Sequence, residues 1–169
     1  MSASTLDTPA TSRGRRTFHT LRVADVERLC ADAVAVTLDV PAELAAEYDF
    51  RPGQSLTLRR QEEHGEERRT YSICAPRGDK PRIGVRLVPT GLFSSWLTEQ
   101  VQRGDELDVM PPSGGFTPDL TRSGRHVLIA AGSGITPVLS IAASLLRDTS
   151  SQVAVIYGNR RSDTVMFAY

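Results

Sequence analysis

The sequence predicts a small antiparallel β-barrel followed by the beginning of an α/β unit. Between Phe18 and Met110, apolar residues largely alternate with polar ones in short segments, and the connections between the segments are brief. This period of two is typical of half-buried antiparallel strands, and about six of them close naturally into a barrel. From Val127 the pattern changes to a continuous apolar run, a helical stretch and a second apolar run, which indicates a β-α-β unit with parallel strands.

The barrel is expected to contain six strands, one short helical turn and one longer helix. The expected strands are two within Phe18–Val40, followed by Ser55–Arg60, Arg68–Cys74, Arg82–Val88 and Glu106–Met110. Pro41–Glu47 starts with proline and continues in helix formers, so it predicts one helical turn. Gln61–Glu67 is too polar for a core and contains glycine, which favours a hairpin tip. Phe93–Val101 has apolar residues at helical spacing and predicts the helix.

The second unit is predicted to consist of a strand, a helix and a strand, at Val127–Ala131, Ile135–Leu146 and Gln152–Tyr157. The breakers and polar residues of Thr117–Arg125 place the boundary between the two units there. We therefore divide the chain into a tail at 1–17, a barrel at 18–118 and a second unit at 125–169. Two strands and one helix cannot cover both faces of a sheet, so part of this unit is expected to stay exposed.

Composition narrows the classes of function. Twenty Lys and Arg balance twenty Asp and Glu, so no net field favours a nucleic acid or an anionic membrane, and a small-molecule or protein partner is expected. The two cysteines and three histidines lack the spacing of metal ligands, so no metal site is predicted.

The Ser-, Thr- and Arg-rich tail has no apolar signal core and is expected to be disordered, with a transit peptide as the alternative. No apolar run is long enough to span a membrane, and a cytoplasmic location is expected.

Gly132-Ser-Gly134-Ile-Thr-Pro137 is the most informative short segment. It directly follows a predicted strand and opens a predicted helix. In that setting glycines allow a tight turn and a close approach to a pyrophosphate, whose charge meets the exposed amides at the helix start. The alternative is a strand-to-helix turn without a ligand.

Two further segments carry groups that suit a nucleotide. Alternation along a strand places Arg69 and Tyr71 on one face with Ser72 beside them, which offers a guanidinium for phosphate, a ring and a hydroxyl. Gly91-Leu-Phe-Ser94 stands at a helix start, where Ser94 is expected to cap and free amides would suit phosphate. The alternatives are an exposed polar sheet face and a cap without a ligand.

The order of these motifs resembles the ferredoxin-NADP reductase family of flavoproteins. Arg69-x-Tyr71-Ser72, Gly91-x-x-Ser94, Pro112-x-Gly114-x-Phe116 and Gly132-x-Gly134-x-x-Pro137 follow one another as they do in that family. Within it, the stretches Arg69–Ala75, Gly91–Leu97 and Ala130–Val138 look most like the reductase subunits of bacterial phenylacetyl-CoA epoxidases, which act in phenylacetate catabolism. Other reductases that feed oxygenases share much of the pattern.

The resemblance implies an FR-type FAD-binding barrel at 18–118 and the N-terminal part of an NAD(P)-binding domain at 125–169. It implies FAD as cofactor, NAD(P)H as hydride donor and an oxygenase component as electron acceptor. No side chain is implied as catalytic, because the cofactors carry the chemistry, and Ser72 would lie near flavin N5. The implied cofactor-binding residues are Arg69, Thr70, Tyr71, Ser72, Val85, Arg86, Leu87, Gly91, Leu92, Phe93, Ser94, Gly132, Gly134 and Thr136.

The sequence also departs from the family. The rest of the NAD(P)-binding domain and the [2Fe-2S] domain of the epoxidase reductases are not in this chain, so it is expected to be a fragment of a longer product. No Asp or Glu directly follows the second predicted strand, where a classical Rossmann domain would have its ribose-binding acid. This weakly favours NADPH, and the choice between NADH and NADPH stays open. Three alternatives also stay open: a reductase of another oxygenase, a flavin-binding module without turnover, and an oligonucleotide-binding barrel.

Overall fold

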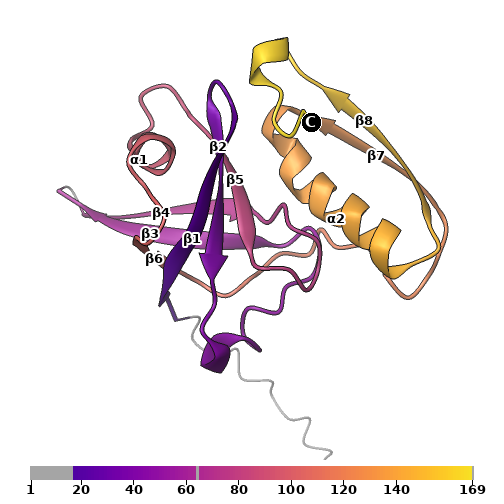
Figure 1. Cartoon of the computed structure of the whole chain (residues 1–169), viewed down its shortest axis with the longest axis horizontal. Helices are drawn as coiled ribbons and strands as arrows, with labels where there is room; N and C mark the ends of the chain where they lie inside the picture. The colour runs from indigo at the N-terminus through magenta and orange to yellow at the C-terminus, as the bar shows by residue number, and fades with distance from the viewer. Residues whose placement is uncertain (1–16, 64, 169) are drawn as a thin grey trace, which may run out of the picture.

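The computed structural model describes residues 17–63 and 65–168, and within them it has the predicted two-part architecture (Figure 1). The expected tail at 1–17 lies almost entirely outside the described residues, as does His64. The barrel contains β1 (His19–Cys30), β2 (Ala33–Asp39), β3 (Ser55–Glu62), β4 (Gly65–Ser72), β5 (Arg82–Arg86), α1 (Leu92–Glu99) and β6 (Glu106–Val109). The second unit contains β7 (Arg125–Ala131), α2 (Ile135–Asp148) and β8 (Gln152–Gly158). The described residues also form three short 3-10 helices: η1 (Ala42–Leu44), η2 (Gly132–Gly134) and η3 (Ser162–Thr164).

The six barrel strands form one antiparallel sheet in the order β4-β3-β6-β1-β2-β5. An isolated antiparallel bridge between Ile73 and Ile83 connects the chain after β4 to β5, the strand at the opposite edge. This bridge closes the sheet on itself, which leaves fewer unpaired edge groups. The predicted antiparallel six-stranded architecture is therefore confirmed.

The barrel interior is filled by the inward-facing half of each alternating strand and by one face of α1. The fully buried members with the largest side chains include Leu21, Leu38, Leu56, Leu58, Ile73, Ile83, Phe93 and Leu97. In β1 and β3 the alternation that predicted the strands corresponds to a division between core and surface. In β2, by contrast, Ala33–Val36 are all buried, because its other face packs against the second unit.

The prediction that Gln61–Glu67 forms a hairpin tip is wrong in its extent. β3 continues to Glu62 and β4 starts at Gly65, so most of this polar run is paired strand. Here the hairpin extends beyond the barrel core, and its charges neutralise one another. Arg60 lies 2.9 Å from Glu62, and Arg69 lies 3.0 Å from Glu67.

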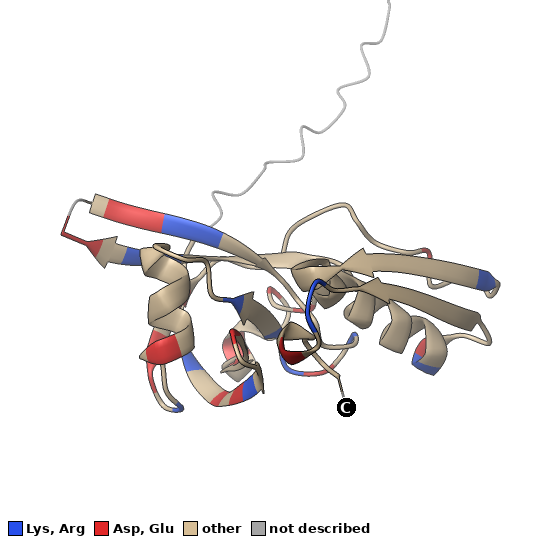
Figure 2. Cartoon of the chain, turned by 90° about the horizontal axis from the view of Figure 1, so that it is seen from above, with Lys and Arg blue, Asp and Glu red and all other residues tan. Residues whose placement is uncertain are grey.

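The second unit is a two-stranded parallel sheet with α2 packed along one side of it. Figure 2 shows that its strands are nearly free of charged residues compared with the barrel. The side away from α2 exposes Val127, Ile129 and Ile156 by 66%, 72% and 58%. This agrees with the expectation that two strands and one helix leave apolar surface uncovered.

The two units share a small apolar core. It combines Leu29, Ala33 and Ala35 of the barrel with Ala130, Ile135, Val138 and Met166 of the second unit. Figure 1 shows α2 on the side of the second unit that faces the barrel. The interface therefore orients α2, and the turn that precedes it, relative to the barrel. Within the described residues, no helix is long and apolar enough to cross a membrane.

Candidate functional site

The β4 motif presents two of its side chains on the face that alternation predicts. Arg69 stands opposite Leu58 in the strand register and pairs with Glu67, whereas Arg68 stands opposite Arg59 and pairs with Glu66. The Arg68 guanidinium lies 5.0 Å from the centre of the Phe18 ring, on the other face of the hairpin. Thr70 shares that other face, where its hydroxyl lies 2.9 Å from the hydroxyl of Thr57. The neighbouring arginines therefore serve different surfaces.

Tyr71 connects the β4 motif to the helix motif. Its ring centre lies 6.3 Å from that of Phe93 in the first turn of α1. Burial raises the pKa of Tyr71 to about 12, although the nearby Arg69 acts to lower it. The phenol therefore stays neutral at physiological pH. Two motifs that are twenty residues apart in the sequence thus share one edge of the barrel.

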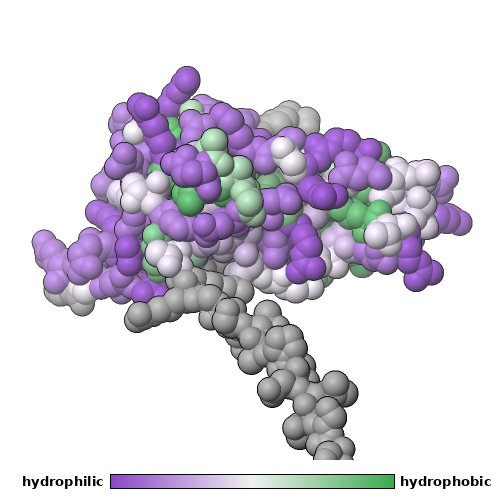
Figure 3. Space-filling view, turned by 90° about the horizontal axis from the view of Figure 1, so that it is seen from below, coloured by the Kyte–Doolittle hydropathy of each residue, from purple (hydrophilic) through white to green (hydrophobic). Residues whose placement is uncertain are grey.

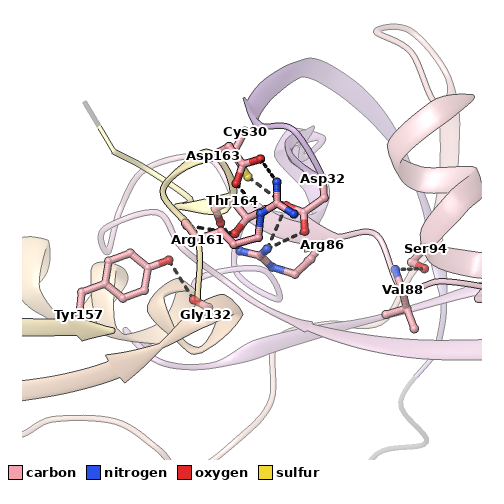
Figure 4. Close-up of polar contacts among 10 residues, drawn as sticks. All are labelled: Cys30, Asp32, Arg86, Val88, Ser94, Gly132, Tyr157, Arg161, Asp163 and Thr164. Carbon is pink, nitrogen blue, oxygen red and sulfur yellow. Dashed lines mark hydrogen bonds and ion pairs between the residues drawn. The ribbon is translucent and has the colours of Figure 1, made fainter. Parts of the chain in front are cut away.

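The turn before α1 is built differently from the prediction that Ser94 caps the helix. The residue at the N-cap is Gly91, and Ser94 lies inside the first turn. The Ser94 hydroxyl accepts a hydrogen bond from the Val88 amide at 3.0 Å (Figure 4). It donates one to the Gly91 carbonyl at 3.0 Å. The serine therefore ties the helix to the loop that precedes it, instead of bonding amides of its own helix.

This turn is also tight and strained. A Cβ on Gly91 would lie 2.9 Å from the Ser94 hydroxyl and 3.1 Å from Val88, so only glycine fits without displacement. Thr90 has a φ of +65°, which is costly for a β-branched residue. Such strain is common where a backbone is shaped for a ligand.

β5 carries some of the barrel residues that contact the second unit. Val85 is buried, whereas Arg86 donates twice to the carboxylate of Asp32, at 2.7 and 2.9 Å, and once to the carbonyl of Thr164 at 2.6 Å. The Nε of Arg86 is buried and has no hydrogen-bond partner among the described residues. The guanidinium therefore retains a donor that could serve a further polar group.

The glycine turn has the shape that its sequence predicts. Gly132 has a φ of +52°, and a Cβ at either Gly132 or Gly134 would point into open space. Tyr157 on β8 donates from its hydroxyl to the Gly132 carbonyl at 3.0 Å (Figure 4). Gly134 precedes the first residue of α2, and Thr136 bonds back to the Ser133 carbonyl at 2.9 Å. Hydrogen bonds thus fix the turn at both of its ends. Other side chains do not cover the surface over its two glycines.

A cavity of about 650 Å³ lies where β5 meets the glycine turn, and we call it the interdomain cavity. Its barrel lining includes Asp32, Arg86, Leu87 and Pro89, and its lining from the second unit includes Ala131, Gly132, Ser133, Gly158, Asn159, Arg160, Arg161 and Thr164. Three of the residues predicted from the sequence, Arg86, Leu87 and Gly132, therefore line one space. Arg69, Tyr71, Ser72 and Ser94 do not line it and belong to the neighbouring barrel edge.

Several residues of this region were not predicted to have a role. Asp32 and Thr164 lie far from Arg86 in the sequence, and only the folded chain brings them together. Gly84 is a second case: a Cβ there would lie 2.6 Å from Thr136 and 3.0 Å from Met166. A glycine inside a strand is the sequence signal that could have indicated this close approach.

The barrel edge and the glycine turn together define a class of protein, a cofactor-binding barrel joined to a nucleotide-binding β-α-β unit. Comparison with known proteins agrees with that class. Residues 20–117 match the oxidoreductase FAD-binding domain family, and residues 128–168 match the oxidoreductase NAD-binding domain family. The chain belongs to the FAD- and NAD-binding oxidoreductases that are related to ferredoxin-NADP reductases.

Individual relatives support the same assignment. The chain is 46% identical over 157 residues to one subunit of the 1,2-phenylacetyl-CoA epoxidase of Escherichia coli K12, with 89% of this chain and 44% of that protein covered. The flavohem-like FAD/NAD-binding domain of nitric oxide dioxygenase from Vibrio cholerae superposes with a TM-score of 0.77 at 29% identity, covering 91% and 67% of the two chains. Phthalate dioxygenase reductase superposes with a TM-score of 0.75 at 28% identity, covering 89% and 46%. The chain thus spans less than half the length of its relative from the epoxidase.

The residues present fit both cofactors. The open surface over Gly132 and Gly134, at the start of α2, suits a phosphate group. Arg69 is 53% exposed, and its guanidinium lies 3.0 Å from the Glu67 carboxylate and donates to the Arg68 carbonyl at 2.8 Å. The exposed part of the guanidinium is available to an anionic ligand. The strained turn at Thr90 and Gly91 presents backbone rather than side chains at the start of α1.

Proposed function

We propose that the chain is the flavin-reducing part of an NAD(P)H-dependent reductase that supplies electrons to an oxygenase. In this proposal the barrel edge binds FAD through Arg69, Tyr71, Ser72, Leu87 and the turn Gly91–Ser94. Thr70 and Val85 contribute backbone only, because the Thr70 side chain lies on the opposite face and the Val85 side chain lies in the barrel core. The interdomain cavity takes the nicotinamide nucleotide, with Gly132 and Arg86 in its lining. Gly134 and Thr136 follow Gly132 at the start of α2 and shape the turn without lining the cavity. The bound flavin supplies a ring that accepts hydride and releases electrons one at a time.

The protein side chains bind and orient the reactants in this proposal. Arg69 balances phosphate charge, and the neutral Tyr71 provides a ring edge and a hydroxyl at the flavin side of β4. The Ser72 hydroxyl would provide a hydrogen-bond donor near flavin N5. Gly132 and Gly134 let the backbone approach the nucleotide phosphates, where the helix start favours negative charge. Orientation of this kind supplies much of the rate of a bimolecular transfer.

The interdomain cavity is the observation that carries the proposal. Arg86 and Leu87 of the predicted flavin strand and Gly132 of the predicted nucleotide turn line the same space, although they are about fifty residues apart. Hydride transfer requires donor and acceptor rings in contact, so both binding segments must converge. A barrel that bound flavin alone would not need the glycine turn at this position.

The proposal also covers the protein that accepts the electrons. Similarity to a component of phenylacetyl-CoA epoxidase favours that enzyme, and other oxygenases remain the alternative. Phthalate dioxygenase reductase is described as transferring electrons from pyridine nucleotides to [2Fe-2S]. We propose that electrons leave this flavin through a [2Fe-2S] centre held outside the 169 residues.

Reconstitution tests the flavin assignment directly. The purified chain is mixed with FAD or with FMN, desalted, and examined for retained flavin absorption. We expect FAD to be retained and FMN to be retained less, because the turn at Gly91 is assigned to the pyrophosphate. A colourless protein after desalting would refute the assignment, and preferential retention of FMN would refute the role of the turn.

A further inference from the structure

The face of α2 that packs on the barrel carries a row of polar side chains. Thr136, Ser140 and Ser144 recur every four residues, so they lie along one face of the helix. Their exposed fractions are 4%, 0% and 0%. Hydroxyl groups buried this completely must find partners, or the fold loses the energy of their hydration.

The partners of both serines belong to the chain that follows β4. Ser140 donates from its hydroxyl to the Ala75 carbonyl at 2.6 Å, and the Arg77 amide donates to the Ser144 hydroxyl at 2.9 Å. One turn further along α2, Arg147 lies 3.0 Å from Asp79. Successive turns of the helix therefore contact every second residue of one barrel loop, 75–79.

The other end of α2 is fixed by a steric contact. The first turn of the helix lies so close to β5 that a Cβ on Gly84 would be 2.6 Å from the Thr136 side chain. The contacts at Gly84, Ala75 and Arg77 thus hold the helix at both ends of its first ten residues. A shift of α2 along its own axis by a single residue would move each serine by about 1.5 Å. Such a shift would break both serine hydrogen bonds.

The position of α2 along this axis has a consequence for the reaction. The helix begins directly after Gly132–Gly134. Its position along its own axis therefore determines how far the glycine turn lies from the barrel. The loop that receives the serine bonds begins three residues after Ser72, at the end of the β4 motif. The bonds therefore connect the segment assigned to the nucleotide with the segment assigned to the flavin.

We propose that Ser140 and Ser144 are positioning residues, which fix the axial register of α2 on loop 75–79 and so hold the nicotinamide at transfer distance from the flavin. This inference rests on the proposed function. Reacting atoms must approach to about 3–3.5 Å, and a misplacement of about 1 Å can cost a hundredfold in rate. Hydrogen bonds to buried groups provide that precision, whereas apolar contacts tolerate sliding more easily.

The test compares Ser140→Ala, Ser144→Ala and the double variant with the wild-type chain. Ser150→Ala is the matched control, because Ser150 is exposed just beyond the far end of α2. Each protein is loaded with FAD, and its retained flavin is measured before NADPH or NADH is added without oxygen. Flavin reduction is followed over a range of nucleotide concentrations, and exchange of the Arg77 amide hydrogen is followed in parallel.

We expect each single variant to retain FAD and to reduce it about tenfold more slowly at saturating nucleotide, with a smaller change in the half-saturating concentration. The double variant should be slower still, and its Arg77 amide should exchange faster than in the wild type. Ser144→Thr keeps a hydroxyl at this position, and a rate closer to the wild type than that of Ser144→Ala is expected.

Wild-type reduction rates in the double variant would overturn the inference, whatever the amide exchange shows. Unchanged protection of the Arg77 amide in Ser144→Ala would also overturn it, because the proposed bond would then not hold the loop. A wild-type chain that retains FAD but is never reduced by nucleotide contradicts the proposed function, and with it this role of the two serines. In that case the amide exchange shows separately whether the serines fix the helix on the loop.

Discussion

Arg86 and Asp32 form an ion pair at the junction of the two units, with Nη1 of the arginine 2.7 Å from Oδ2 of the aspartate. The two side chains are only 22% and 31% exposed. The same guanidinium donates to the Thr164 carbonyl, so one arginine on β5 binds both the β1–β2 turn and η3 (Figure 4). The pair therefore stabilises the barrel wall of the interdomain cavity.

Replacing Asp32 should destabilise the fold, because Arg86 would lose its carboxylate while remaining mostly buried. We expect Asp32→Ala to lower the free energy of unfolding by about 1–3 kcal/mol. Asp39→Ala is the control: its partner Lys80 is 64% exposed, and such a pair contributes at most about 1 kcal/mol. Urea denaturation measures both variants, and equal losses would contradict the role given to the buried pair.

Arg69 and Arg68 should differ in their effect on flavin binding, because the strand directs them to opposite faces. Arg69→Ala should weaken FAD binding by about 1.5–3 kcal/mol, the value of a charge-assisted hydrogen bond. Arg68→Ala removes the same charge from the face that carries Phe18 and should weaken binding much less. Flavin fluorescence titration gives both dissociation constants, and equal values would mean that the face is assigned wrongly.

Tyr71 should make the protein sensitive to alkaline pH. Its pKa is raised from 10 to about 12 by burial. Below pH 10 the phenol is protonated in both the folded and unfolded chain, so the full stability is present. Above that pH the unfolded chain releases the proton first, and stability falls until the pH passes about 12.

Tyr71→Phe should flatten this alkaline loss of stability, although burial also raises the pKa of Tyr48, which contributes a loss of its own. The measurement is the free energy of unfolding in urea across the alkaline range. A slope against pH that is as steep in Tyr71→Phe as in the wild type would show that Tyr71 does not contribute.

The local features of the site were predictable because they follow from short-range rules. Strand alternation correctly separates Arg69 from Arg68. The position of Gly132 between a strand and a helix correctly predicts a tight turn, in which the structure gives Gly132 a positive φ. The charged surface of the barrel and the few small green patches between purple residues in Figure 3 also agree with a sequence of average hydropathy.

The features that were missed depend on tertiary packing. Asp32 is an ordinary turn residue until folding places it against Arg86, and no local pattern predicts that contact. The role of Ser94 as a cap was wrong because the Val88 amide, brought close by the tight turn at Gly91, competes for its hydroxyl. Hydrogen bonds from a side chain to a backbone group far away in the sequence, such as the bond from Ser140 to Ala75, cannot be predicted from a single sequence either.

Gly84 should be irreplaceable where α2 meets β5. A methyl group there would lie 2.6 Å from Thr136, so Gly84→Ala must displace the helix or the strand. We expect a loss of about 1–3 kcal/mol in unfolding free energy, as for other overpacked sites. Gly115→Ala is the control, because nothing lies within 4 Å of its Cβ position and the change should be nearly neutral. Equal stabilities of the two variants would show that the interface yields without cost.

Flavin on the barrel and nucleotide at the glycine turn should meet in one site, and Gly132 tests this central claim most directly. A Cβ at Gly132 would meet open space, so the side chain of Gly132→Val does not touch the barrel. The branched side chain and its strain at a φ of +52° both disturb the turn, and the variant should therefore block the nucleotide. Gly124→Ala, one residue before β7, is the control. The FAD-loaded proteins are mixed with NADPH or NADH without oxygen, and loss of the flavin absorption band is followed. We expect nucleotide to bleach the wild-type and control flavins, whereas Gly132→Val retains FAD that only a chemical reductant bleaches. Bleaching of Gly132→Val at the wild-type rate, or a wild-type flavin that no nucleotide bleaches, would contradict a shared site.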